Sequence, residues 1–282
     1  MIRFRSVLFV PGDRAERFVK AMASAADALI LDLEDSVSLA NKGKAHESVS
    51  EFLSHKQSKP VFVRVNPLSS DMIKNDLAAV QQNLPDGIML PKAEGEKDIE
   101  GLLSLMGERD VPILPIASET PNGLFELGSY RNVSKHLCGL TWGAEDLPAA
   151  IGASTSREAD GSYTPPFEWV RSNVLFAAHA ANVPAIETVY PNIKDEDGLA
   201  AYAARGRRDG YTAMMAIHPV QCEIINAAFT PSVDELVWAQ KIIDAFEANP
   251  SAGVLQIDGK MIDAPHLKQA KNIVAQGKIY NT

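Results

Sequence analysis

The stretch VPILPIASETPNG, residues 111–123, begins as an apolar run and ends in polar and turn-forming residues. Its first half is nearly continuous in Val, Ile, Leu and Ala, as expected for a strand that is buried on both faces of a parallel sheet. Pro121 and Gly123 end the strand, because neither residue suits the interior of a central strand. Glu119 therefore lies at the end of a buried strand, where an uncompensated charge would be costly.

Seven further apolar runs of this kind alternate with helix-like segments along the chain. They cover residues 6–10, 28–32, 61–65, 87–91, 137–142, 184–189 and 213–217. The segment after the first run has helical spacing, with Asp13 as the expected N-cap. Eight strand–helix units match a (β/α)8 TIM barrel in number and length. A doubly wound sheet is the alternative, but it usually has fewer strands and a glycine-rich first turn, which VPGDRAERF lacks.

The pattern changes after residue 218. Residues 230–248 are expected to form a helix, since Ser232 and Glu235 have the spacing of a capping box. A glycine-containing break follows, and a last short helix is expected from Met261. We therefore predict a catalytic barrel over residues 1–230. The C-terminal helices and a lid segment over residues 231–282 are expected to dock on the barrel or on a neighbouring subunit.

Composition excludes several classes of partner. The net charge is −9 and the isoelectric point is about 5.2, which argues against nucleic acid or an anionic membrane. Cys138 and Cys222 have no disulfide or metal spacing, which indicates a reducing compartment. The first apolar run is too short for a signal peptide, and no stretch approaches the roughly 20 apolar residues of a membrane span. We expect a soluble, cytoplasmic protein.

The polar residues that end the apolar runs are informative, because a barrel of this kind builds its active site at the carboxyl ends of its strands. Charged or polar residues follow nearly every run: Asp13, Arg14, Asp32, Glu34, Asp35, Arg64, Asn66, Lys92, Glu119, Glu145, Asp146, Glu187 and His218. The polarity of loops explains some of them. It does not explain Arg64, which lies inside VFVRVN among apolar residues. We therefore interpret Arg64 as a functional residue.

Glu119 and Asp146 end the fifth and sixth strands, so they should be neighbours on the barrel rim. Two converging carboxylates suit Mg2+, which keeps water ligands and takes oxygen atoms from a substrate. The alternative is that each carboxylate caps the next helix. A divalent cation beside the Arg64 guanidinium could hold a 2-oxo acid and stabilise an enolate oxygen.

The remaining polar residues have more ordinary interpretations. His218 could act as a general base, but a structural role in the turn after the eighth strand is favoured. Asp32, Glu34 and Asp35 form an acidic cluster in which some members must be paired, and they are expected to orient Arg64 or metal-bound water. Cys138 is interpreted as a packing residue rather than a nucleophile.

The segments that carry these residues resemble one known family in order along almost the whole chain. They are RSVLFVPGDRAERF, ALILDLEDSV, VRVN, IMLPKAE, ASETPNGL, GAEDLPAAIG, AIHPVQCEIINAAFTPS and GKMIDAPHLKQA. Together they resemble the citrate lyase β-subunit-like branch of the HpcH/HpaI aldolases, near the malyl-CoA and citramalyl-CoA lyases. The resemblance implies a Mg2+-binding (β/α)8 barrel that makes or breaks carbon–carbon bonds in 3-hydroxyacyl thioesters and assembles as a homotrimer or hexamer.

The resemblance also implies roles for individual residues. Glu119 and Asp146 match the family's metal ligands, and Arg64 matches the arginine that meets the substrate carbonyl. Asp263 matches an aspartate that acts as acid/base from an adjacent subunit. The positions that match contacts to CoA are Phe9, Arg14, Arg17, Lys20, Ile186 and Glu187.

Three residues depart from the family pattern. His46 replaces an arginine, Glu187 replaces an aspartate, and Met214 stands where a lysine is usual. The first two are expected to change pairing around the site or contacts to the cofactor tail. The third removes one expected phosphate contact.

The resulting hypothesis is reversible cleavage of a 3-hydroxyacyl-CoA, such as malyl-CoA or citramalyl-CoA, into acetyl-CoA and a 2-oxo acid. The alternatives are a malyl-CoA thioesterase and a citryl-thioester lyase subunit of a citrate lyase complex. A catalytically silent binding or scaffold protein is a further alternative. The presence of Arg64, Glu119, Asp146 and Asp263 in one chain argues against it.

Overall fold

The computed structural model describes residues 4–107 and 109–280. The chain forms two units, Met1–Asn226 and Ala227–Thr282, which are described separately.

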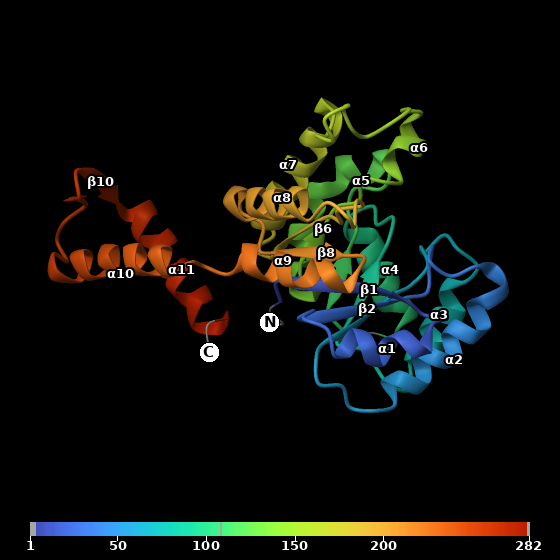
Figure 1. The fold of residues 1–282 in the computed structure, drawn as a ribbon. Coiled ribbons are helices and arrows are strands. Elements are labelled where there is room, and N and C mark those ends of the chain that lie inside the picture. Colours follow the sequence, from blue (N-terminus) through green and yellow to red (C-terminus); the bar gives the residue numbers. More distant parts are fainter. Residues whose placement is uncertain (1–3, 108, 281–282) are drawn as a thin grey trace. The chain divides into compact units, whose positions relative to one another are not determined.

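The first unit contains the eight strands that the apolar runs predict (Figure 1). They are β1 (Ser6–Pro11), β2 (Ala28–Asp32), β3 (Val61–Arg64), β4 (Gly87–Leu90), β5 (Ile113–Pro115), β6 (Leu140–Thr141), β7 (Ala185–Glu187) and β8 (Ala213–Ala216). All seven strand pairs are parallel, and the order in the sheet is β5-β4-β3-β2-β1-β8-β7-β6. The prediction of a parallel eight-stranded sheet is confirmed.

Two single bridges join the ends of this sheet. Ile113 pairs with Leu137 and Ile116 pairs with Thr141, both in parallel orientation. The backbone N–H of Ala117 donates to the carbonyl of Thr141 at 2.9 Å. The strands β5 and β6 thus meet, and the sheet forms a nearly closed (β/α)8 barrel.

Helices surround these strands (Figure 1). They are α1 (Ala15–Met22), α2 (Lys42–Leu53), α3 (Ile73–Val80), α4 (Glu96–Leu105), α5 (Pro121–Glu126), α6 (Leu147–Ile151), α7 (Pro165–Ala180), α8 (Glu196–Asp209) and α9 (Pro219–Phe229), with the 3-10 segments η1 (Leu39–Asn41) and η2 (Leu127–His136). The expected N-cap of α1 is wrong by one residue, because Arg14 occupies that position without a side-chain capping bond. Asp13 instead accepts a hydrogen bond from Asn41 Nδ2 at 2.7 Å.

Apolar side chains fill the barrel interior. The central cluster comprises Phe4, Val7, Ala28, Ile30, Phe62, Met89, Leu114, Ile116, Cys138, Ile186, Ala213 and Met215. Gly87 is required where β4 passes Phe62, since a Cβ atom there would lie 2.3 Å from the Phe62 ring. Cys138 belongs to this core, as its interpretation as a packing residue requires.

The second unit is a helical hairpin with a small sheet. Its helices are α10 (Val233–Ala248) and α11 (Ala264–Tyr280), and between them β9 (Val254–Ile257) pairs antiparallel with β10 (Lys260–Asp263). The predicted capping box of Ser232 and Glu235 is present. The expected helix start at Met261 is wrong, because this residue lies in β10. Asp258 and Gly259 both have positive φ and form the tight turn that an Asp-Gly pair favours.

Within the described ranges, no helix is long and apolar enough to cross a membrane.

Candidate active site at the carboxyl ends of the strands

Arg64, the last residue of β3, is held by two carboxylates and an aromatic ring. Its Nε and Nη2 donate to the two Asp32 oxygens at 2.6 and 2.7 Å, and Nη1 lies 2.9 Å from Glu34 Oε2. The guanidinium carbon lies 5.0 Å from the centre of the Phe9 ring. Burial opposes the charged form, but the bonds and charge of Asp32 and the charge of Glu34 raise the pKa of Arg64. The guanidinium is therefore charged and fixed in direction.

Asp32 and Glu34 lie against Arg64, as the acidic cluster predicts. Burial favours a protonated Asp32, yet the bonds and charge of Arg64 lower the pKa of this carboxyl below its usual value. Glu34 is also buried. Burial raises its pKa, and the charges of Arg64 and Lys92 only partly oppose this effect.

Glu119 is buried where β5 ends, with 4% of its surface exposed. The capping alternative does not account for it, because Thr120 caps α5 by accepting a bond from the Gly123 N–H at 3.1 Å. The Glu119 side chain packs on Gly143, where a Cβ atom would lie 2.8 Å from Glu119 Cγ. Burial raises the pKa of Glu119 to about 8, and the negative charges of Asp146 and Glu34 contribute.

Asp146 precedes α6, but its side chain makes no capping hydrogen bond. Its Oδ1 instead lies 3.5 Å from Lys92 Nζ, and 36% of the side chain is exposed. Asp146 and Glu119 line the same cavity, as predicted for the ends of neighbouring strands.

Lys92 is a member of the site to which the sequence analysis assigned no role. Its backbone N–H donates to Glu119 Oε2 at 2.6 Å, and its Nζ donates to Glu34 Oε1 at 2.7 Å. Its φ of 52° lies in the left-handed region, which costs a residue with a Cβ atom about 1–2 kcal/mol. The signal in the sequence was a lysine directly after the fourth strand in LPKAE, but its partners come from three other strand ends.

A cavity of about 260 Å³ brings several predicted residues together. Its lining includes Phe9, Asp32, Arg64, Glu119, Asp146, Thr188 and Met215. This placement agrees with an active site at the carboxyl ends of the strands.

A buried network supports the loops after β2 and β3. Lys42 Nζ donates to the carbonyls of Leu33 and Glu34. Asn66, two residues after Arg64, donates from its backbone N–H and its Nδ2 to Asp76 Oδ2, both at 2.6 Å. His46 Nε2 lies 2.6 Å from the other Asp76 oxygen. The departure at His46 therefore affects support of the site.

Several of the predicted CoA-binding residues lie elsewhere. Arg14, Arg17 and Lys20 are exposed on or beside α1 and are not among the residues that line the cavity. Ile186 is fully buried in the barrel core. Met214, at the position where the family has a lysine, is also fully buried.

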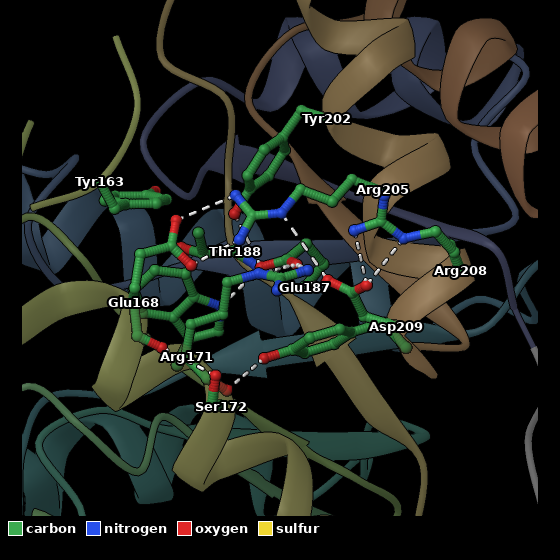
Figure 2. Close-up of polar contacts among 12 residues, drawn as sticks. Tyr163, Glu168, Arg171, Ser172, Glu187, Thr188, Tyr202, Arg205, Arg208 and Asp209 are labelled. Carbon is green, nitrogen blue, oxygen red and sulfur yellow. Dashed lines mark hydrogen bonds and ion pairs between the residues drawn. The ribbon is translucent and has the colours of Figure 1, made fainter. Parts of the chain in front are cut away.

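Glu187 is fully buried in a polar network between β7 and the helices α7 and α8 (Figure 2). Its Oε1 accepts bonds from Trp142 Nε1 at 2.6 Å and from the Tyr202 hydroxyl at 2.8 Å. Its Oε2 accepts from Arg171 Nε at 2.8 Å, and Arg171 Nη1 continues to Asp209 at 2.8 Å. Thr188, the next residue, lines the cavity and donates its backbone N–H to Glu187. Glu187 thus holds the end of β7 from behind the cavity.

Asp263 belongs to the second unit, at the end of β10. Its Oδ1 lies 2.5 Å from His266 Nδ1, and this hydrogen bond lowers the pKa of the Asp263 carboxyl. The two side chains are 38% and 48% exposed within the chain.

The charges around the cavity fit a divalent cation. The carboxylates that line the cavity are Asp32, Asp35, Glu119, Glu145 and Asp146, and Glu34 lies beside them. The cations that contact carboxylates of this group in the described part of the chain are Arg64 and Lys92. No group of three His, Cys, Asp or Glu side chains in the described part of the chain is arranged to hold a metal. Two carboxylates nevertheless suit Mg2+, which binds few protein groups and keeps several waters.

A family model described as HpcH/HpaI aldolase/citrate lyase matches residues 5–219. The chain belongs to this family. The resemblance inferred from the sequence is confirmed, and the HpcH/HpaI match covers all eight strands of the barrel.

Relatives within the HpcH/HpaI family have more than one named activity. The chain is 32% identical to the citrate lyase subunit beta of Haemophilus influenzae, over 97% of both chains. It is 31% identical to the mitochondrial citramalyl-CoA lyase of Rattus norvegicus, over 96% of this chain and 85% of that protein. The crystal structure of CitE from Mycobacterium tuberculosis in complex with magnesium, acetoacetate and coenzyme A is 33% identical. It covers 98% of both chains with a TM-score of 0.85, which confirms the barrel fold.

The buried environment of Glu187 generates a stability prediction. Glu187→Gln places an amide N–H2 among groups that donate, and we expect it to lower the free energy of unfolding by about 3–5 kcal/mol, as when a buried ion pair loses one partner. Denaturant unfolding measures the change. Arg208→Gln is the control, since the exposed Arg208–Asp209 pair should contribute less than about 1 kcal/mol. Equal small effects of both substitutions would contradict the prediction.

Proposed function

We propose that this HpcH/HpaI family member is a Mg2+-dependent carbon–carbon lyase that cleaves or forms a 3-hydroxyacyl-CoA. Malyl-CoA and citramalyl-CoA are the proposed type of substrate, and acetyl-CoA and a 2-oxo acid are the products. The observation that carries the proposal is the convergence of Glu119, Asp146 and the Arg64 guanidinium on one cavity at the barrel rim. The magnesium and coenzyme A bound to the M. tuberculosis CitE structure support it.

Glu119 and Asp146 are the proposed Mg2+ ligands. When bound there, Mg2+ supplies a Lewis acid that orients the 2-oxo acid and lowers the energy of negative charge on its oxygens. Gly143 leaves room for the Glu119 carboxylate, and the Lys92 backbone N–H fixes one of its oxygens. These contacts keep the carboxylate aimed before the ligand arrives.

Arg64 is proposed to stabilise the thioester enolate. Cleavage breaks the bond between C2 and C3, the C3 hydroxyl gives its proton to solvent water as the C3 carbonyl forms, and the electron pair of the broken bond passes to the acetyl-CoA half as an enolate. The guanidinium is held by Asp32 and Glu34, so it needs little reorganisation as negative charge develops. Asp263 is the proposed acid/base that moves the proton at the methyl carbon, supplied by a neighbouring subunit in a homotrimer or hexamer.

Four of the six residues expected at CoA remain proposed contacts, and two do not. Phe9 lines the cavity beside Arg64, and the exposed Arg14, Arg17 and Lys20 are proposed to attract the CoA phosphates. Ile186 and Glu187 are fully buried, so we propose that they support the end of β7 and do not touch CoA. A cytoplasmic location is proposed from the acidic composition and the two buried free cysteines.

A citryl-thioester lyase subunit of a citrate lyase complex is the second candidate, favoured by the similarity to the H. influenzae subunit. A malyl-CoA thioesterase would use the same metal site and Arg64. Water would attack the thioester carbonyl, and the C2–C3 bond would stay intact.

A first prediction of the proposed function concerns turnover. We expect malyl-CoA or citramalyl-CoA to yield acetyl-CoA and a 2-oxo acid in the presence of Mg2+, and EDTA to abolish this activity. Glu119→Gln should lower turnover more than about 100-fold, because even residues that only orient metal ligands commonly contribute 10–100-fold. Chromatography of the products measures the outcome.

The same assay separates the candidates. Free malate and CoA would identify a thioesterase, and turnover of citryl groups only on an acyl carrier protein would identify a citrate lyase subunit. Mg2+-dependent activity at the wild-type level in Glu119→Gln would contradict the metal assignment.

A second prediction concerns pH. Because the pKa of Glu119 without metal is raised to about 8, this carboxyl is mostly protonated at neutral pH, and Mg2+ must displace its proton. The Mg2+ affinity should therefore rise by up to about tenfold per pH unit below pH 8 and level off above it. Calorimetry in buffers of different ionisation enthalpy measures the released proton. A pH-independent affinity between pH 6 and 8 would contradict the prediction.

A third prediction concerns the origin of Asp263. Glu119→Gln and Asp263→Asn should each be nearly inactive alone. When the two variants are mixed, unfolded and refolded together, some sites combine an intact Glu119 with an intact Asp263 from another chain, and up to about a quarter of the activity should return. No recovery in mixed oligomers, shown by native mass spectrometry to have formed, would place the acid/base residue within one chain or remove it from the mechanism.

A further inference from the structure

Lys92 has a conformation that a lysine does not favour. Its φ of 52° is in the left-handed region, where glycine would avoid the steric cost of a Cβ atom. Residues held in such conformations often serve a site, because the surrounding contacts must compensate for the strain. Here the backbone N–H contacts Glu119 and the ammonium contacts Glu34, so both ends of the residue are engaged in the site.

The ammonium of Lys92 lies among three carboxylates at different distances. Nζ is 2.7 Å from Glu34 Oε1, 3.5 Å from Asp146 Oδ1 and 3.9 Å from Asp35 Oδ2. The contact with Glu34 has the length of a charge-assisted hydrogen bond, whereas the contact with Asp146 is a looser ion pair. Glu34 is therefore the anchor of the ammonium, and Asp146 can exchange its partner without releasing Lys92.

Arg64 cannot take over this role. Two of its guanidinium nitrogens are bound to Asp32 and the third lies 2.9 Å from Glu34. Among the described ion pairs, Lys92 is the only cationic partner of Asp146, and without it Glu34 would keep only Arg64. The carboxylates of Glu34, Asp35 and Asp146 would then repel one another with less compensating positive charge.

We infer that Lys92 is an internal counter-ion of the cation site: its ammonium neutralises the site in the metal-free protein, and a divalent cation displaces it from Asp146 while Glu34 retains it. This inference rests on the proposed metal site. Lys92 is thus a positioning residue that stabilises the metal-free state and weakens cation binding. The Lys92 ammonium therefore weakens binding of a divalent cation that arrives without the negatively charged substrate.

The inference predicts effects of opposite sign in one variant. Lys92→Met removes the ammonium while the length of the side chain and the backbone strain stay similar. We expect it to lower the melting temperature of the protein in EDTA. We also expect it to tighten binding of Mg2+, and of Mn2+ as a second probe, on the order of tenfold. Calorimetry without substrate measures the two dissociation constants, and thermal unfolding measures the stability.

Two further variants separate the loss of the ammonium from the backbone strain and from the change in net charge. Lys92→Gly keeps the left-handed backbone and should show the same tighter cation binding, with part of the stability restored by relief of strain. Lys59→Met is the matched control, since Lys59 donates to the Ser24 carbonyl outside the cavity. It changes the net charge equally and should leave the cation affinity within about twofold, because distant charges are screened.

The outcomes distinguish this inference from the proposed function. If Lys92→Met destabilises the metal-free protein but binds Mg2+ equally or more weakly, Lys92 is only a structural brace, and the metal site stands without the counter-ion. A Lys92→Met protein that is as stable as wild type in EDTA would also overturn the inference. If wild-type protein binds neither Mg2+ nor Mn2+, the proposed function itself fails, and the inference fails with it.

Discussion

The pairing of Arg64 with Asp32 and Glu34 is the interaction on which the rest of the site depends. It places a fixed positive charge at the end of β3, in a barrel whose central cluster is apolar. Because Asp32 receives two donors from one guanidinium, the guanidinium can neither rotate nor withdraw without leaving a buried carboxylate without its cationic partner. Glu34 then shares its second oxygen with Lys92, which extends the same charge balance to the ends of the fourth to sixth strands.

Two polar systems lie on opposite sides of the barrel wall. The cavity side contains groups that can meet a ligand, such as Arg64 and Asp146. The helix side contains the Glu187–Arg171–Asp209 network, which is closed by its own hydrogen bonds (Figure 2). Two consecutive residues at the end of β7 serve both, since Glu187, its last residue, points to the helices and Thr188, which follows it, borders the cavity. The alternation of side chains along a strand accounts for this division.

The sequence predicts the barrel well because burial on both faces leaves a strong local pattern of continuous apolar runs. The placement of Arg64, Glu119 and Asp146 around one cavity was also predictable, since the carboxyl ends of neighbouring strands meet at one rim of the barrel. Lys92 and the burial of Glu187 were not, because both depend on partners from distant segments. The hairpin at residues 254–263 was missed although its Asp-Gly turn was visible. Its short strands resemble the start of the following helix in composition.

The seam between β5 and β6, where the two ends of the sheet meet, lies between the segments that carry Glu119 and Asp146. Pairing there consists of two isolated bridges, so no continuous ladder joins these two strands. Glu119 follows one side of the seam and Asp146 follows the other. A cation bound by both carboxylates would connect the segments that follow β5 and β6. Its binding free energy would then stabilise the barrel where no continuous strand ladder joins its two ends.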